Sequence, residues 1–201
     1  MLQSIHHPST LNTTNPSRPA PPPGWPDPLD EAAFYGLAGG VVSTIEPHTE
    51  ADPAALLVQF LVCYGNVIGR TLHFTAEGSQ HHCNLFTCLI GDTSKGRKGS
   101  SFAHLIRLFR LIRTVDSQWL DERIATGLAS GEGLIHAIRD PVEQQDPIKE
   151  KGRVIDYQSV VIDQGELDKR LLVVESEFAS PLKVMAREGN TLSPVLRQAW
   201  D

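Results

Sequence analysis

The feature that most constrains this chain is an apolar run followed by a basic, glycine-rich loop and an amphipathic helix. The run covers residues 84–90, and the helical periodicity covers Phe102 to Val115. Glycine N–H groups can surround an anion, and a helix N-terminus adds about half a positive charge. This order therefore predicts a phosphate-binding loop between a strand and a helix. Its candidate residues are Gly91, Asp92, Thr93, Ser94, Lys95, Gly96, Arg97, Lys98, Gly99, Ser100 and Ser101.

The common phosphate-loop pattern, G-x-x-x-x-G-K-[ST], fits the loop in part. Counted from Gly91, the second glycine falls on Gly96. Arg97 then stands at the lysine position and Lys98 at the hydroxyl position. The pattern alone is equally typical of a basic surface loop, so its neighbours in the sequence decide the interpretation.

Two other alignments of the loop remain open. In the variant K-G-G-x-G-K-[ST], four residues fit: Lys95, Gly96, Gly99 and Ser101. Ser100 replaces the second lysine of that variant. A one-residue insertion instead makes Lys98 the phosphate-binding lysine, with Ser100 or Ser101 as the Mg²⁺ ligand. All three alignments predict contact between this loop and a nucleotide.

Composition places the chain among soluble globular proteins. It has 201 residues, of which 40% are apolar and 21% charged, and its formal net charge is −6. No apolar run approaches the roughly 18 residues of a membrane span, and no signal-peptide pattern opens the sequence. Three cysteines form no disulfide framework. We therefore expect a cytoplasmic protein without a membrane partner, and the acidic charge argues against non-specific coating of nucleic acid.

The N-terminal third divides into two parts. Residues 1–28 hold eight of the fourteen prolines and are predicted to be a disordered tail, with Trp25 as a possible anchor. A plain linker is favoured here over a proline-rich partner motif. Residues 29–69 are predicted to be a helical module, with one helix to Ile45 and a second from an Asp52 N-cap to Ile68.

A second apolar run, Leu171 to Val174, is typical of a strand buried on both faces. It ends at Glu175 and Glu177, and ligands bind at the carboxyl edge of open parallel sheets. One carboxylate there can hold Mg²⁺ and the other can polarise an attacking water. Glu132, at a predicted helix start, is either a first-turn acid or a further nucleotide-site carboxylate.

Other segments receive plainer interpretations. Strands are predicted at 71–76, 84–90 and 154–162, residues 140–153 are expected to be flexible, and helices are expected to Arg139 and at 178–188 and 192–200. Cys83 and Cys88, beside two histidines, are interpreted as buried packing residues rather than zinc ligands. The arginines of the helix after the loop, Arg107, Arg110 and Arg113, are interpreted as a solvated face.

Together these segments resemble a known family over residues 25 to 201. The likeness lies in Trp25–Pro28, Glu50–Pro53, Gly91–Ser101, Ser130–Gly133 and Glu175–Trp200. These resemble the P-loop ATPase domain of unknown function found in phage- and mobile-element-associated helicase/primase proteins, a RecA/DnaB-like NTPase relative. The resemblance implies an α/β fold, with a RecA-like parallel sheet over residues 70–201.

The resemblance also implies a function: binding and hydrolysis of ATP with Mg²⁺ in DNA replication, by a homo-oligomer. Ser100, Ser101 and Glu175 are then the candidate metal ligands, and Glu175, Glu177 and Glu132 the candidate catalytic residues. Only four strands are predicted, so further strands and an arginine finger are expected after Asp201, and weak turnover is expected of this chain. The alternatives are a non-catalytic nucleotide-binding or interaction module, or an inactive fragment.

Overall fold

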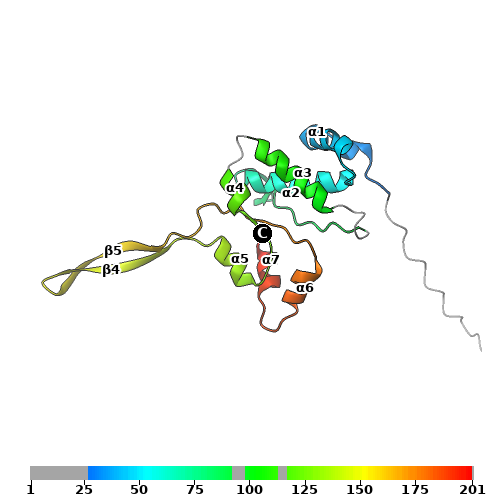
Figure 1. Ribbon diagram of the computed structural model, residues 1–201. Coiled ribbons are helices and arrows are strands. Elements are labelled where there is room, and N and C mark those ends of the chain that lie inside the picture. Colours follow the sequence, from blue (N-terminus) through cyan, green and yellow to red (C-terminus); the bar gives the residue numbers. More distant parts are fainter. Residues whose placement is uncertain (1–26, 92–97, 113–116, 201) are drawn as a thin grey trace, which may run out of the picture.

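The computed structural model describes residues 27–91, 98–112 and 117–200 as a mixed α/β molecule (Figure 1). The predicted disordered tail, except its last two residues, lies outside the described residues. So does the part of the glycine-rich loop from Asp92 to Arg97.

The N-terminal helices begin and end where local signals place them. They are η1 (Glu31–Ala33), α1 (Gly36–Ile45), η2 (Glu46–His48) and α2 (Pro53–Ile68). Asp52 caps α2 as predicted, because its carboxylate accepts a hydrogen bond from Ala54 N at 2.7 Å and Pro53 occupies the first turn. The first helix begins later than expected, at Gly36, whose φ of 62° suits glycine.

Helix α2 is the centre of the hydrophobic core. It packs against α1 and α3 (Lys98–Leu111). α4 (Ser117–Glu122) packs against α3 and donates a hydrogen bond to α2, from Trp119 Nε1 to Asn66 Oδ1. The Phe109 ring lies between those of Phe60 and Trp119, with centroid distances of 6.1 and 5.8 Å. Burial also raises the pKa of the Cys63 thiol to about 12, as expected of a cysteine that serves only packing. The buried cluster comprises Val42, Ala51, Leu56, Leu57, Phe60, Cys63, Leu105, Phe109, Trp119 and Leu172.

The described strands form three separate two-stranded sheets. β1 (His73–Ala76) and β2 (Ser79–His82) make a short antiparallel hairpin. β3 (Ile124–Ala125) and β6 (Leu172–Val173) pair in parallel beside the core. β4 (Val142–Glu150) and β5 (Arg153–Asp163) form a long antiparallel hairpin, here called the arm.

Two strand predictions and the prediction of one flexible segment require correction. Residues 84–90 belong to none of the sheets formed by the described residues; they run as an extended and largely exposed segment toward Gly91. Residues 154–162 do form a strand, but it pairs antiparallel with residues 142–150, which were expected to be flexible. The two strands pair because the chain reverses at a two-residue turn, Lys151–Gly152, where both φ angles are positive (49° and 81°). Such a turn matches the twist of a hairpin.

The C-terminal helices form a second packed unit below the core. α5 (Gly131–Ala137) packs against α7 (Leu192–Gln198), and α6 (Ala179–Met185) lies beside α7. Figure 1 shows this group under α2 and α3, with the arm extending to one side. No helix in the described part of the chain is long and apolar enough to span a membrane.

Candidate functional site

The described half of the glycine-rich loop forms the first turn of α3. Lys98, Gly99, Ser100 and Ser101 all lie in this helix, which has 14 residues. The first N–H groups of an α-helix have no partner within the helix, and its N-terminus carries partial positive charge. The end of α3 that follows the loop therefore presents donors and positive charge, which is what an anion requires.

The two candidate serine ligands differ in accessibility. Ser101 is completely buried, and its Oγ donates a hydrogen bond to the Lys98 carbonyl at 2.8 Å. Ser100 is exposed. Ser101 therefore stabilises the first turn of α3, and Ser100 is the hydroxyl that a ligand at this helix end could reach.

Gln59 is a residue of this region that sequence reasoning missed. Its Nε2 donates to the same Lys98 carbonyl at 3.3 Å, although 39 positions separate the two residues. Its Oε1 is buried and has no hydrogen-bond partner among the described residues. A glutamine within the apolar pattern of α2 was the only available signal, and that signal is weak.

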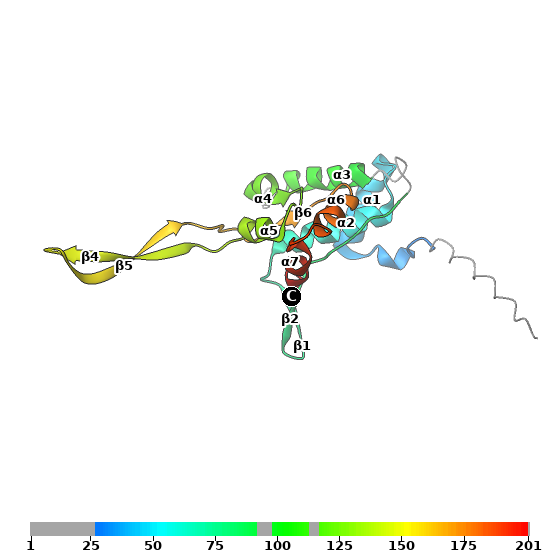
Figure 2. The ribbon, with the colours of Figure 1, turned by 90° about the horizontal axis from the view of Figure 1, so that it is seen from below.

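Helix α2 also fixes the two extended segments that bear on the site. Gly65 packs so closely on the Cys83 carbonyl that a side chain at this position would overlap it. The next residue, Asn66, donates from Nδ2 to the Leu171 carbonyl at 3.1 Å. Segment 84–91 and β6 therefore start from one turn of α2. Figures 1 and 2 show segment 84–91 running from there toward the end of the molecule where α3 begins.

Glu175 lies where the carboxyl end of a parallel strand was predicted. Val174 N donates to the Ala125 carbonyl at 2.9 Å, which closes the pairing of β3 with β6 immediately before Glu175. The half-buried carboxylate accepts a hydrogen bond from Leu128 N at 2.6 Å. The loop after β3 therefore holds the Glu175 side chain in place.

The other two candidate carboxylates have different surroundings. Glu177 is exposed, and its main-chain carbonyl accepts a hydrogen bond from Ser180 N at the start of α6. Glu132 accepts a hydrogen bond from Thr191 Oγ1 at 2.7 Å, and this bond is the main cause of its lowered pKa. Glu132 thus links α5 to the start of α7.

One loop connects Glu175 with Glu132. Leu128 contacts Glu175, the Ala129 carbonyl accepts a 3.4 Å hydrogen bond from Asn190 Nδ2, and Ser130 caps α5. Gly131 then packs against Thr191 so closely that a Cβ there would lie 2.5 Å from its Oγ1. The second glycine-rich stretch is therefore a packing element, and it supports the carboxyl edge of β3 and β6.

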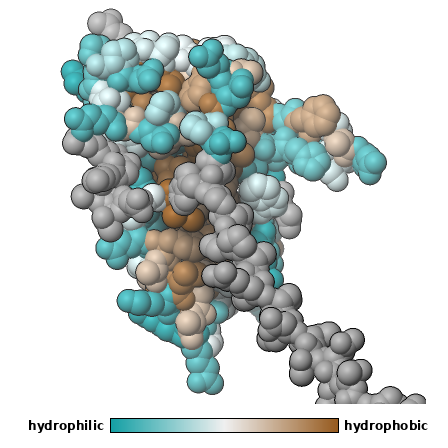
Figure 3. Space-filling view, turned by 90° about the vertical axis from the view of Figure 1, so that its right-hand side faces the viewer, coloured by the Kyte–Doolittle hydropathy of each residue, from teal (hydrophilic) through white to brown (hydrophobic). Residues whose placement is uncertain are grey.

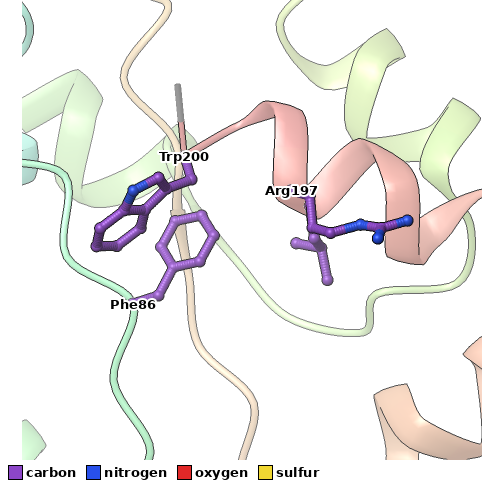
Figure 4. Close-up of a pocket in the computed structure, with 4 residues that line it drawn as sticks. Phe86, Arg197 and Trp200 are labelled. Carbon is purple, nitrogen blue, oxygen red and sulfur yellow. The ribbon is translucent and has the colours of Figure 1, made fainter.

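A pocket lies elsewhere, between segment 84–91 and α7. Phe86, Leu196, Arg197 and Trp200 line an open hollow of about 440 Å³ (Figure 4). The Phe86 and Trp200 rings meet edge to face, with centroids 5.3 Å apart. None of the candidate nucleotide-site residues lines this hollow.

The cysteine prediction is wrong in part. Cys83 and Cys88 are free but exposed, because the segment that carries Cys88 packs into no sheet. The described residues contain no group of three or more His, Cys, Asp or Glu that could hold a metal ion. On α3, Arg107 and Arg110 are exposed, as expected of a solvated face; Arg113 lies outside the described residues.

Comparison with models of known families, with curated proteins and with solved structures finds no match in any of the three.

Proposed function

We propose that this chain is an ATP- and Mg²⁺-binding P-loop ATPase, helicase-like or primase-associated, that acts in the DNA replication of phage or mobile elements. One observation carries the proposal. The extended segment before the glycine-rich loop and the strand that ends in Glu175 start from the same turn of α2, at Gly65 and Asn66. This arrangement supports a phosphate loop and an acidic strand end that serve one site.

The residues at the start of α3 suit a triphosphate. Lys98 supplies a positive charge, Ser100 an accessible hydroxyl, and the helix end supplies N–H groups. Lys95 and the glycines at 91 and 96 complete the proposed cradle. Magnesium, when bound, bridges phosphate oxygens and neutralises part of their charge. Ser100 and Glu175 offer the hydroxyl and carboxylate oxygens that this ion prefers.

Gln59 strengthens the fit between this helix end and a polar ligand. Its Oε1 is buried without a partner among the described residues, and the Nε2 of the same amide donates to the Lys98 carbonyl. Burial of an amide oxygen without a partner costs about 1–3 kcal/mol, so native proteins rarely leave one there. In the proposed function, a polar group of the ligand at the first turn of α3 supplies the partner that this oxygen lacks.

A second function, nucleotide binding without hydrolysis, is favoured by the contact of Glu175. Its Oε1 accepts a 2.6 Å hydrogen bond from Leu128 N. A carboxylate held in this way is less available to polarise a water. In this alternative the chain is a nucleotide-responsive module, and the loop after β3 reports on the state of Glu175.

Titration with fluorescently labelled ATP, with and without Mg²⁺, tests the shared part of both proposals. Lys98→Ala, Lys95→Ala and the double variant should weaken binding, since a charge-assisted phosphate contact contributes about 1.5–3 kcal/mol. Lys149→Ala, on the arm, is the matched control. Binding by the double variant equal to that of the parent would show that the loop is not a phosphate site.

A turnover assay separates the two functions. If the chain hydrolyses ATP, Glu175→Gln should remove hydrolysis while leaving binding within a few-fold of the parent. If the parent binds ATP but shows background turnover, with or without single-stranded DNA, the non-catalytic function is the correct one.

A further inference from the structure

The short hairpin of β1 and β2 carries two histidines that face each other across its strands. Its register pairs His73 with His82, and their ring centroids lie 5.6 Å apart in an edge-to-face arrangement. The chain reverses at Glu77–Gly78, since Ala76 pairs with Ser79. Hydrogen-bonded and non-hydrogen-bonded pairs alternate away from such a turn, which makes His73–His82 a non-hydrogen-bonded pair. Side chains lie closest in pairs of that kind.

The distance between the two rings suits one shared metal ion. An imidazole nitrogen lies about 2.0–2.1 Å from a zinc ion that it binds. Two imidazoles on one such ion therefore have ring centres roughly 5–6 Å apart when the angle at the metal is wide. The 5.6 Å separation of the His73 and His82 rings falls in this range. The two side chains therefore need only small rotations to share an ion.

His82 has a ring nitrogen that the rest of the protein does not use. Its Nδ1 is buried and has no hydrogen-bond partner among the described residues. A buried polar atom of this kind costs stability unless a water or an ion meets it. Neutral imidazole is the commonest metal ligand in proteins and binds through either nitrogen. His73 is exposed, so its ring can turn and admit an ion to this nitrogen.

The hairpin also lacks the packing that usually holds two strands together. None of the residues from His73 to His82 is buried. Figure 2 shows the hairpin projecting from the body, and Figure 3 shows the same projection, to the right, standing clear of it. An isolated two-stranded hairpin is only marginally stable in water. An ion shared by His73 and His82 would fasten the strands at the end opposite the turn.

The donor atoms select the class of ion. Imidazole suits zinc, copper and nickel, whereas magnesium and calcium require oxygen ligands. No group of three or more His, Cys, Asp or Glu that could hold a metal occurs in the part of the chain that the structure describes. Water must therefore fill the positions that the two histidines leave. A site with two protein ligands holds an exchangeable ion, in contrast to the four protein ligands of a structural zinc site.

We propose that His73 and His82 bind a divalent transition-metal ion of the zinc, nickel and copper class. His82 binds it through Nδ1, His73 binds it through the ring nitrogen that turns toward it, and water completes the coordination. The ion fastens β1 to β2 immediately before Cys83, whose carbonyl packs on Gly65 of α2. The site uses neither exposed cysteine, and it depends on neither the nucleotide nor the Mg²⁺ of the proposed function.

Calorimetric titration of the full chain with zinc chloride and with nickel chloride tests the proposal. His6→Asn and His7→Asn are introduced into every chain, because two adjacent histidines near the N-terminus would bind these ions themselves. His73→Asn and His82→Asn should each weaken binding at least about tenfold, since even residues that only support a metal ligand contribute 10–100-fold.

The matched control for this titration lies in the same hairpin. His81 is one residue from His82, so its side chain points to the opposite face of the strand. His81→Asn should therefore bind zinc like the parent. Equal affinities of the parent, His73→Asn and His82→Asn, or a parent that binds neither zinc nor nickel, would overturn the proposal.

NMR spectra of the histidine rings show where the ion lies. Zinc should shift the ring signals of His73 and His82, including Nδ1 of His82, and leave those of His81 unchanged. Cys83 is the nearest competing ligand in the sequence, because it is free and exposed. If Cys83→Ser abolishes zinc binding while His82→Asn does not, the thiol holds the ion and the proposal is wrong.

Hydrogen exchange measures what the ion does to the hairpin. A ligand that binds only the folded hairpin slows exchange by a factor of one plus the ratio of its concentration to Kd. The amides of residues 73–82 should therefore exchange about tenfold more slowly in zinc at ten times Kd, and Mg²⁺ should have no such effect. Equal slowing in the His73→Asn chain would show that the ion acts at another place, which contradicts the proposal.

Discussion

At the scale of single residues, several long polar side chains connect segments that are distant in sequence. Arg123 is 5% exposed, yet its guanidinium donates to the carbonyls of Arg170 and Ala137 and pairs with Glu166 at 3.2 Å. A buried charge is tolerated only when it is paired and hydrogen-bonded in this way. This arginine ties β6, α5 and the loop before β6 together, and so it supports the position of Glu175.

Asn66 offers a direct test of this kind of link. It accepts a 2.7 Å hydrogen bond from the indole N–H of the fully buried Trp119 and donates to the Leu171 carbonyl. Asn66→Leu leaves both groups unpaired, so the free energy of unfolding should fall by about 1–3 kcal/mol. Urea denaturation measures this, with the exposed Gln198→Leu as control. An unchanged midpoint would show that water replaces the amide.

The ion pair at the base of the arm predicts a dependence on pH. The Arg139 side chain, followed by the Gly165 N–H, lowers the pKa of Asp163 from 3.8 to about 2. A depressed folded-state pKa contributes stability that is complete above the ordinary pKa and is lost as the pH falls from about 4 to 2. Asp163→Asn should therefore flatten the dependence of the melting temperature on pH within that window.

The partner variant is the control for this prediction. Arg139→Gln removes the main cause of the shift, so it should flatten the same window. The double variant should add little to either single change, because both act on one pair. Additive effects would show that Asp163 and Arg139 act independently.

Two adjacent glycines in α1 are expected to respond in opposite ways. A Cβ on Gly39 would overlap the Phe34 carbonyl, whereas a Cβ on Gly40 would meet nothing within 4 Å. Gly39→Ala should cost about 1–3 kcal/mol by overpacking, and Gly40→Ala should gain about 0.5–1 kcal/mol. Thermal unfolding of both variants measures the difference. Equal effects would contradict the close approach at Gly39.

At the scale of elements, the arm depends on its turn more than on packing. Lys151 and Gly152 both have positive φ, which β-branched residues adopt only with strain. Gly152→Val should weaken the hairpin by about 1–2 kcal/mol, whereas Lys151→Asn should be tolerated. Hydrogen exchange at the amides of residues 142–163 should report the loss locally, with the core amides unchanged.

The parallel pair β3–β6 shows how short a sheet can be when its surroundings are fixed. Only two residues of each strand pair, yet Leu172 is buried in the core and Leu172 N donates to the Arg123 carbonyl. The pair is positioned by α2 through Asn66 and by α5 through Arg123. The neighbouring helices, rather than a wide ladder, therefore fix where Glu175 emerges.

At the scale of the whole molecule, the fold depends on the core around α2. Among the residues that the structure describes, every buried member of that core lies at or after Val42. A chain beginning at Asp30 should therefore melt within a few degrees of the parent, as measured by calorimetry. A fall of many degrees would show that residues 1–29 contribute to packing.

The sequence by itself determined the features that depend on local chemistry. The Asp52–Pro53 start of α2, the apolar stripe of α3 and the burial at Leu172 follow from capping, helical periodicity and an apolar run. The position of Glu175 at a strand end follows in the same way. These signals lie within a few residues of the structure that they specify, so they can be recognised without the rest of the chain.

The tertiary structure alone decided which segments meet. Residues 84–90 carry the composition of a strand, but a strand requires a neighbour, and no local signal says whether one is present. The arm was missed because its polar first strand becomes regular only when paired across the Lys151–Gly152 turn. Gln59, Arg123 and Asn66 bridge 39, 47 and 105 positions, respectively. Such contacts depend on where the helices pack, because sequence spacing carries no information about distance across a core.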